Sequence, residues 1–218
     1  MRLVSVNVGL PRELNSEAGT VITGIFKEPV QGPVRARTLN LDGDGQADLS
    51  VHGGAHKAVY AYPFEHYGYW RREMSGMEMP LGMFGENFTT EGVLENDVHI
   101  GDGFRVGTAE LVVTQPRLPC YKLGLKFGRN DMVKRFLASG RTGFYLSVSR
   151  EGEVEAGNTL ESIHRDPAGV AIPEITRLYV SKNYGPADLE ILNRAVEIPA
   201  LPQSWRQYFL ERLQNAGS

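Results

Sequence analysis

The residues best suited to chemistry lie in one short segment, residues 115–122. Cys120 is the only cysteine of the chain, and it has Arg117 three residues before it and Lys122 two residues after it. Nearby cations stabilise a thiolate, so we expect this thiol to ionise more readily than an isolated one. Two prolines in the segment restrict the backbone that leads to it. Cys120 is therefore a candidate for chemistry, and the alternative is a small buried apolar residue.

The residues alone leave three interpretations of this segment open. The first is a thiolate ligand to a metal or cofactor, surrounded by basic side chains that would hold an anionic group. These basic residues are Lys27, His52, Lys57, Arg117 and Lys122. Soft thiolates select late or redox-active metals, and one cysteine cannot hold an iron–sulfur cluster or a structural zinc ion. In this interpretation the cofactor brings its other ligands.

The second interpretation is a cysteine hydrolase, with Cys120 as nucleophile and one of the five histidines as base. The Pro-Cys-Tyr context resembles no nucleophile elbow, and no histidine is singled out. The third is a binding module without catalysis, in which Cys120 is buried and the loops contact a partner. Metal analysis separates the first interpretation from the second, and the kinetics of thiol alkylation separate the third from both.

Two glycine-containing loops upstream have polar residues that suit ligand binding. His52 and Lys57 flank the pair Gly53-Gly54, which lets a backbone approach a ligand closely. We expect this loop to bind an anion, because it offers no third ligand for zinc. The loop from Asn40 has acidic residues at EF-hand spacing but valine at its twelfth position, so we expect a tight acidic turn and no calcium.

Composition narrows the class of protein. A net charge of -3 argues against general nucleic-acid binding. A single cysteine cannot form an internal disulfide bond, which fits a reducing compartment. The chain shows neither the apolar run of a signal peptide nor a window long enough to span a membrane. We expect a cytoplasmic protein without membrane association.

The pattern of apolar residues predicts a mainly β domain followed by helices. Short alternating segments joined by glycine turns, from residue 3 to residue 157, are typical of a barrel or sandwich. Helices are expected from Pro63 and from an N-cap at Asn130, with a flexible lid over residues 74–83 between them. We place the first domain at residues 1–165. Three proline-initiated helices form a second domain at residues 166–218, which we expect to pack on the first.

Several motifs taken in order resemble one known family. They are Gly43-Asp44-Gly45-Gln46-Ala47-Asp48, Val51-His52-Gly53-Gly54, Lys57-Ala58-Val59, Tyr62-Pro63, Gly85-Glu86-Asn87-Phe88-Thr89-Thr90 and the segment from Gln115 to Leu123. Together they look like a MOSC domain (molybdenum cofactor sulfurase C-terminal domain) of the YiiM type. The resemblance covers most of residues 1–165, and the tail is similar to the small helical domain of YiiM proteins. It implies a MOSC-type β-barrel with a few helices and a small C-terminal three-helix domain.

The resemblance also implies a cofactor and a set of site residues. The cofactor is the molybdenum cofactor (Mo-molybdopterin), and pyridoxal phosphate is not required. Cys120 matches the protein ligand to the metal, and His52 is a candidate proton donor or pterin contact. The expected cofactor contacts are Lys27, His52, Lys57, Asn87, Thr89, Arg117, Cys120 and Lys122. A dithiolene from the pterin would complete the soft ligand set that one cysteine cannot supply alone.

The implied activity is an oxidoreductase reaction. It is the reduction of N-hydroxylated compounds, including hydroxylaminopurine-type base analogues and N-hydroxylamines, to the amines plus water. The electrons must come from an external donor such as a flavoprotein reductase, because the chain has no nucleotide fingerprint. The protein is expected to be a monomer or homodimer. The alternative is a non-catalytic protein that carries or binds the molybdenum cofactor or sulfur, since fold alone does not settle function.

Overall fold

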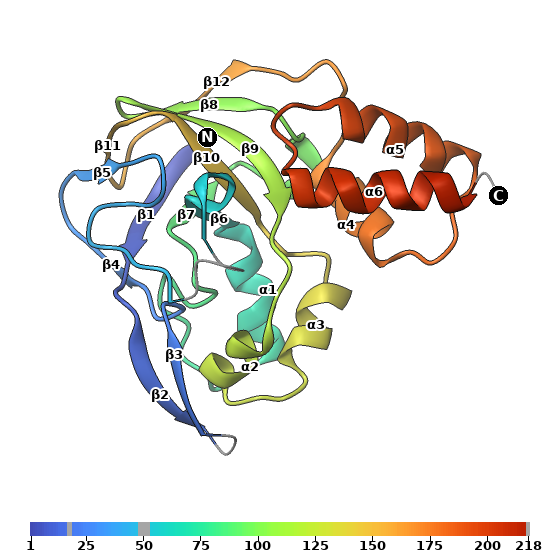
Figure 1. The fold of residues 1–218 in the computed structure, drawn as a ribbon. Coiled ribbons are helices and arrows are strands. Elements are labelled where there is room, and N and C mark those ends of the chain that lie inside the picture. Colours follow the sequence, from blue (N-terminus) through green and yellow to red (C-terminus); the bar gives the residue numbers. More distant parts are fainter. Residues whose placement is uncertain (17–18, 48–52, 217–218) are drawn as a thin grey trace.

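An eight-stranded sheet is the central element of the fold (Figure 1). The computed structural model describes residues 1–16, 19–47 and 53–216. Across the sheet the strands are β12 (Leu160–His164), β8 (Gly103–Val106), β9 (Ala109–Pro116), β10 (Phe144–Arg150), β6 (Val59–Pro63), β7 (Phe88–Glu91), β1 (Arg2–Val8) and β4 (Glu28–Pro29). β6 and β7 run parallel, and the other neighbouring strands run antiparallel.

The two ends of this sheet approach each other where β1 meets the chain leading into β12. The amide of Leu3 donates to the carbonyl of Asn158 (2.9 Å), and the carbonyl of Leu3 accepts from the amide of Gly157 (2.7 Å). The amide of Leu160 donates to the carbonyl of Met1 (3.1 Å). The sheet therefore curls around its apolar inner face. The predicted mainly β fold is confirmed, and the barrel takes the form of a curled sheet whose ends meet at a few backbone hydrogen bonds.

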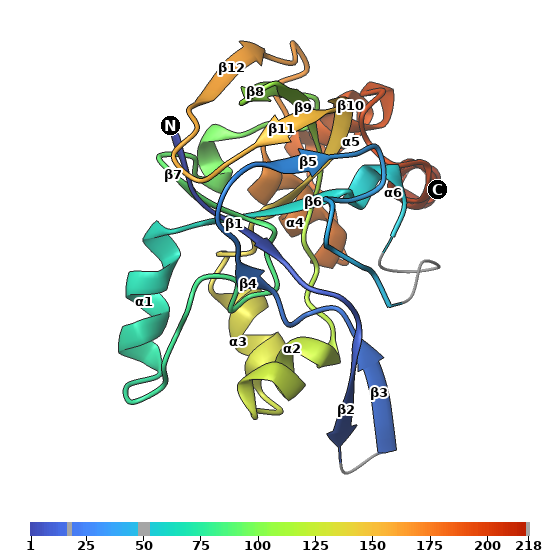
Figure 2. The same ribbon diagram turned by 90° about the vertical axis from the view of Figure 1, so that its left-hand side faces the viewer.

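Two small two-stranded sheets extend the main one. β2 (Arg12–Ser16) and β3 (Gly19–Thr23) form a hairpin that projects from the body of the molecule, and β5 (Val34–Ala36) pairs with β11 (Gly152–Val154) (Figure 2). The hairpin matters for the site because the chain leaves β3 directly into the wall of a pocket.

Three short helices lie at one end of the sheet around an aromatic cluster (Figure 1). They are α1 (Glu65–Glu73), α2 (Tyr121–Phe127) and α3 (Met132–Ala138). The rings of Trp70 and Phe136 stack with their centres 5.9 Å apart, which ties α1 to α3. Aromatic pairs of this kind add about 0.5–1.5 kcal/mol to the free energy gained from burial. The cluster holds α2 and α3 against β6, whose Tyr60 and Tyr62 belong to it.

Two local expectations at this end were wrong, and one helix was not expected. The segment 74–83 is not a lid, because its side chains Met74, Met79 and Met83 are buried in the aromatic cluster. The second predicted helix begins at Met132, and Asn130 does not cap it. The apolar pattern did not predict α2, the helix that starts directly after Cys120.

The three predicted C-terminal helices are present and pack on the sheet (Figure 1). They are α4 (Ile172–Val180), α5 (Pro186–Glu197) and α6 (Gln203–Ala216). Their buried residues belong to the same apolar core as the inner face of the sheet. The boundary at residue 165 stays a prediction. None of the described helices has the length and apolar character needed to cross a membrane.

Candidate functional site

One pocket brings together side chains from distant parts of the sequence. It encloses about 670 Å³ of space, including solvent at its mouth, and lies between the start of α2, the end of the hairpin and the turns around residues 45 and 85. Pockets for small molecules and cofactors fall in this range of volume. Six of the predicted site residues line it, and these are Lys27, Lys57, Asn87, Arg117, Cys120 and Lys122.

Cys120 is presented to the pocket by the connection between a strand and a helix. β9 ends at Pro116, and α2 begins one residue after the cysteine, whose backbone is extended (φ -116°, ψ 173°). The carbonyl of Cys120 accepts from the amide of Leu123 (3.0 Å), so it forms part of the first turn of the helix. The side chain is partly exposed. The positive end of the helix dipole therefore lies next to the thiol.

Arg117 is the most unusual residue of the pocket, because it is 5% exposed and lacks an acidic partner among the described residues. Its guanidinium lies 5.2 Å from the centre of the Tyr60 ring and 5.0 Å from that of Phe136. Nη2 donates to the carbonyl of Phe84 at 3.4 Å, and Nη1 has no hydrogen-bond partner in the described part of the chain. A buried charge is costly unless it is paired, so this arrangement suits an anionic ligand.

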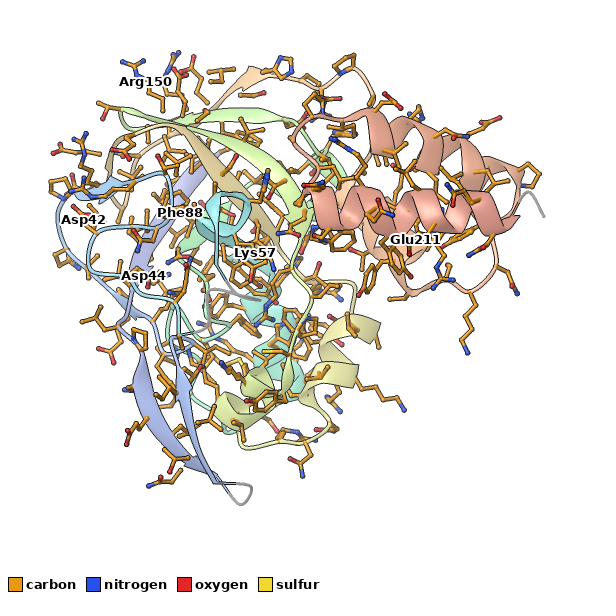
Figure 3. The ribbon with its side chains drawn as sticks, viewed as in Figure 1. Asp42, Asp44, Lys57, Phe88, Arg150 and Glu211 are labelled. Atoms are coloured by element: carbon orange, nitrogen blue, oxygen red, sulfur yellow. The ribbon has the colours of Figure 1, made fainter. Side chains whose placement is uncertain are left out.

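Two lysines add positive charge to the same pocket. Lys57 is half-buried in a single helical turn (Ala55–Lys57), and burial lowers its pKa. Lys122 is half-buried in the first turn of α2. Figure 3 labels Lys57 near the centre of the molecule. With Arg117, these residues give the pocket a cationic side.

Lys27 differs from these cations, because a buried carboxylate neutralises its charge. Its ammonium group donates to Oδ1 of Asp44, and only 8% of the Lys27 side chain and 1% of the Asp44 side chain is exposed. Asp44 also accepts from the amide of Gly9 (3.0 Å) and from Nδ2 of Asn87 (2.9 Å). Burial lowers the pKa of Lys27, and Asp44 opposes this shift. Asp44, which is labelled in Figure 3, belongs to the acidic turn expected from the sequence, and its buried carboxylate binds Lys27.

Asn87 connects the pocket to the strands behind it. Its Oδ1 accepts from the amide of Tyr60 (3.1 Å), while its Nδ2 donates to Asp44. Thr89, which the sequence also placed at the site, is fully buried and does not line the pocket. Its hydroxyl donates to Glu86 (3.0 Å) and accepts from Nδ2 of Asn7 (3.1 Å). Thr89 therefore supports the wall from behind.

Glu86 organises the turn that forms this wall, and sequence reasoning missed it. It is completely buried and accepts from the amides of Gly82 and Phe84 (both 3.0 Å) and from the hydroxyl of Tyr67. Burial raises the pKa of Glu86. The sequence offered no local signal for this role, because Gly85 and Asn87 flank Glu86 as they would in an exposed turn.

Lys126 fixes α2 against the pocket wall and was also missed. Its Nζ donates to the carbonyls of Gly82 (2.7 Å) and Ile25 (2.9 Å). Burial lowers its pKa to about 8.

The glycines of this wall allow close approach of two backbones, because a Cβ on Gly24 would lie 2.4 Å from the carbonyl oxygen of Gly45.

Two aromatic residues that the sequence did not single out complete the pocket. Tyr60 on β6 and Tyr145 on β10 both line it, and their rings lie 5.3 Å apart. The hydroxyl of Tyr60 donates to the carbonyl of Thr142 (2.8 Å). Neither residue was predicted at the site, because each lies in a strand among apolar residues and its sequence context indicates only core packing. The remaining candidate, His52, lies outside the described residues, so its place stays a prediction.

The described side chains do not supply a metal site on their own. Within residues 1–16, 19–47 and 53–216, no group of three or more His, Cys, Asp or Glu residues is placed to hold a metal ion. A metal bound at Cys120 would therefore need most of its ligands from a cofactor.

Comparison with known protein families gives two matches. The MOSC domain matches residues 48–161, and the YiiM-like 3-alpha helix domain matches residues 184–216. YflK of Bacillus subtilis (strain 168) is 40% identical over 211 residues, which cover 96% of this chain and 93% of that protein. A protein named Reductase from Gibberella moniliformis (strain M3125 / FGSC 7600) is 29% identical over 91% of this chain, a stretch equal to 35% of the relative.

Solved structures show the same architecture. The crystal structure of YiiM from Geobacillus stearothermophilus superimposes with a TM-score of 0.80 at 35% sequence identity. The match covers 97% of this chain and 98% of that one. The curled sheet and the three C-terminal helices are therefore shared over nearly the full length of both chains.

Proposed function

Because the chain belongs to the MOSC domain family, with the helical domain of its YiiM-like members, we propose that it is a molybdenum-cofactor-dependent reductase of N-hydroxylated compounds. The substrates are N-hydroxylamines and hydroxylaminopurine-type base analogues, and the products are the amines and water. The family supports a function associated with the molybdenum cofactor, and one relative is named a reductase. The finer assignment of substrate and reaction is our proposal.

The observation that carries the proposal is the pairing of two features in one pocket. Arg117 is a buried cation whose Nη1 has no partner in the described chain, and Cys120 is the single thiol. An anionic cofactor would satisfy the guanidinium, and a cofactor with its own sulfur ligands would complete the coordination that one thiol begins. The residues present therefore fit a molybdenum cofactor with a phosphate-bearing pterin.

Each residue of the pocket has a role in this proposal. Cys120 would be the protein ligand to molybdenum, and the metal would hold its thiol deprotonated. Arg117 would bind the anionic part of the cofactor by charge-assisted hydrogen bonds, and Lys57 and Lys122 would add to the attraction. Asn87 would orient the wall through its bonds to Tyr60 and Asp44.

When bound, the cofactor would supply the two-electron chemistry that no side chain of this protein can perform. The chain's own residues bind and orient the reactants. Tyr60 and Tyr145 line the pocket, and their rings would limit the space in which a bound reactant lies. A flavoprotein reductase is proposed as the external electron donor.

The test is a reduction assay on protein purified from cells that synthesise the cofactor. We expect hydroxylaminopurine to be converted to the aminopurine when a chemical two-electron donor is supplied, and we expect Cys120→Ser to lose this activity while its circular dichroism is unchanged. Retained molybdenum without any reduction would instead support the alternative of a non-catalytic carrier of the cofactor or of sulfur. Full activity in Cys120→Ser would contradict the proposal.

A further inference from the structure

We propose that Lys27 and Asp44 form the proton-donating pair of the pocket, with the ammonium group of Lys27 as the acid that protonates the oxygen leaving the substrate nitrogen. This inference rests on the proposed function and gives Lys27 a role other than the cofactor contact expected from the sequence. It assigns Asp44 the role of positioning the acid and holding its charge.

The first support is the geometry of the pair. Lys27 and Asp44 line the same pocket as Cys120 and Arg117. Asp44 is held in place by the amide of Gly9 and by Nδ2 of Asn87, so both of its oxygens are engaged. The carboxylate is therefore a fixed point, and the ammonium group bonded to it has a defined position at the pocket wall.

The second support is the distribution of charge between the two sides of the pocket. Lys27 is already neutralised by Asp44, whereas Arg117 lacks an acidic partner in the described chain. An anionic group placed beside Lys27 would be repelled by the carboxylate of Asp44. The Arg117 side consequently suits the anionic part of a cofactor, and the Lys27 side suits a neutral group such as a hydroxylamine.

The third support is the environment of the ammonium group. Burial lowers the pKa of Lys27, while the negative charges of Asp44 and Glu86 oppose the shift. The positive charge of Lys27 in turn helps to lower the pKa of Lys126, so the two ammonium groups belong to one electrostatic environment. A lysine whose pKa is brought down towards the working pH is a better acid than an exposed lysine.

The reaction balances with this assignment. In R–NH–OH + 2 e⁻ + 2 H⁺ → R–NH₂ + H₂O, the N–O bond breaks and the substrate is reduced by two electrons from the flavin-type donor. The oxygen leaves with its own hydrogen and one proton from Lys27, as water. The nitrogen takes the second proton from water at the pocket mouth. Water also reprotonates Lys27, whose charged form Asp44 favours.

The decisive variant is Lys27→Arg, which keeps the positive charge beside Asp44 but replaces the acid with a guanidinium that does not release its proton at working pH. Lys134→Arg, on the exposed face of α3, is the matched control. We expect unchanged molybdenum content in both variants. We expect turnover at saturating substrate to fall by about 100-fold or more in Lys27→Arg and to stay unchanged in the control.

Three results would overturn the inference. The first is a wild-type rate and pH profile in Lys27→Arg. The second is a loss of activity in that variant only in proportion to lost molybdenum, which would make Lys27 a cofactor contact. The third result comes from NMR of the cofactor-free protein, where the ¹³Cε resonance of Lys27 gives the midpoint of its titration. We expect Asp44→Asn to lower that midpoint by about one unit or more, and an unchanged midpoint would refute the pairing. If loaded wild-type protein reduces no N-hydroxylated compound, the proposed function itself fails.

Discussion

The guanidinium of Arg117 lies 5.2 Å from the centre of the Tyr60 ring, inside a wall where the described chain offers it no carboxylate. The aromatic faces of Tyr60 and Phe136 return part of the cost of burying this charge, since a cation over a ring is worth about 0.5–2 kcal/mol. The unpartnered Nη1 remains available for a ligand. This relationship distinguishes a binding arginine from one that is part of a structural ion pair.

Arg117→Gln should weaken binding without weakening the fold. Loss of a charge-assisted contact of about 1.5–3 kcal/mol corresponds to a loss of affinity for the anionic cofactor of about 10- to 150-fold. In cofactor-free protein the free energy of unfolding should stay constant or rise, because a buried charge without an acidic partner has been removed. Retention of cofactor and urea unfolding measure the two effects. A fall in unfolding free energy with unchanged retention would make Arg117 a structural residue.

Glu86→Gln should destabilise the turn that forms the pocket wall. Both carboxylate oxygens of Glu86 accept from backbone amides, so the amide nitrogen of a glutamine would face an N–H group that it cannot accept from. We expect a loss of about 1–3 kcal/mol in unfolding free energy, measured by urea denaturation. The exposed Glu78, changed to Gln, is the control and should stay within about 0.5 kcal/mol of wild type. Equal effects at both positions would contradict the role given to Glu86.

Lys126 should make stability depend on pH in the alkaline range. Burial lowers its pKa to about 8 in the folded protein, against the ordinary lysine value of 10.5 in the unfolded chain, so between these values the unfolded chain binds more protons. Stability from this group is therefore lost as pH falls towards 8 and recovered as pH rises towards 10.5, by at most about 1.4 kcal/mol per pH unit. The cost of Lys126→Met should grow with pH over that range. A cost that does not vary with pH would refute the assignment.

Gly24→Ala should open the pocket wall. A Cβ at Gly24 would lie 2.4 Å from the carbonyl oxygen of Gly45, and both atoms belong to backbones that cannot move without shifting the wall. Gly68→Ala in α1 meets no atom closer than 3.8 Å, so it should stabilise the helix by up to about 1 kcal/mol. Thermal unfolding of the two variants should therefore shift in opposite directions. Similar shifts would show that the approach of residues 24 and 45 is unimportant.

The sequence predicted the parts of the site that depend on local pattern. Cys120, Arg117 and Lys122 lie within a few residues of one another, and the apolar periodicities that mark the strands and the three C-terminal helices are also local. The resemblance to the MOSC family predicted Lys57 and Asn87 as cofactor contacts, and the structure places both in the pocket of Cys120. These predictions needed no knowledge of tertiary contacts.

The remaining features depend on contacts between segments that only the fold brings together. Asp44 reaches Lys27 and Asn87 across three separate loops, and Glu86 and Lys126 interact through the wall that they share. No periodicity encodes such pairs. The methionines of residues 74–83 look like those of a mobile loop, but aromatic side chains from three helices enclose them. Thr89 follows Asn87 by two residues on β7 and supports the wall from behind it.

The role of Cys120 as the protein ligand to molybdenum is tested by the ratio of molybdenum to protein in wild type and in Cys120→Ser, both purified from cells that synthesise the cofactor. Elemental analysis with release of the pterin gives this ratio. We expect close to one molybdenum and one pterin per chain in wild type, and loss of molybdenum in Cys120→Ser, whose unfolding free energy should be unchanged. Equal molybdenum content in the two proteins, or none in either, would contradict this role.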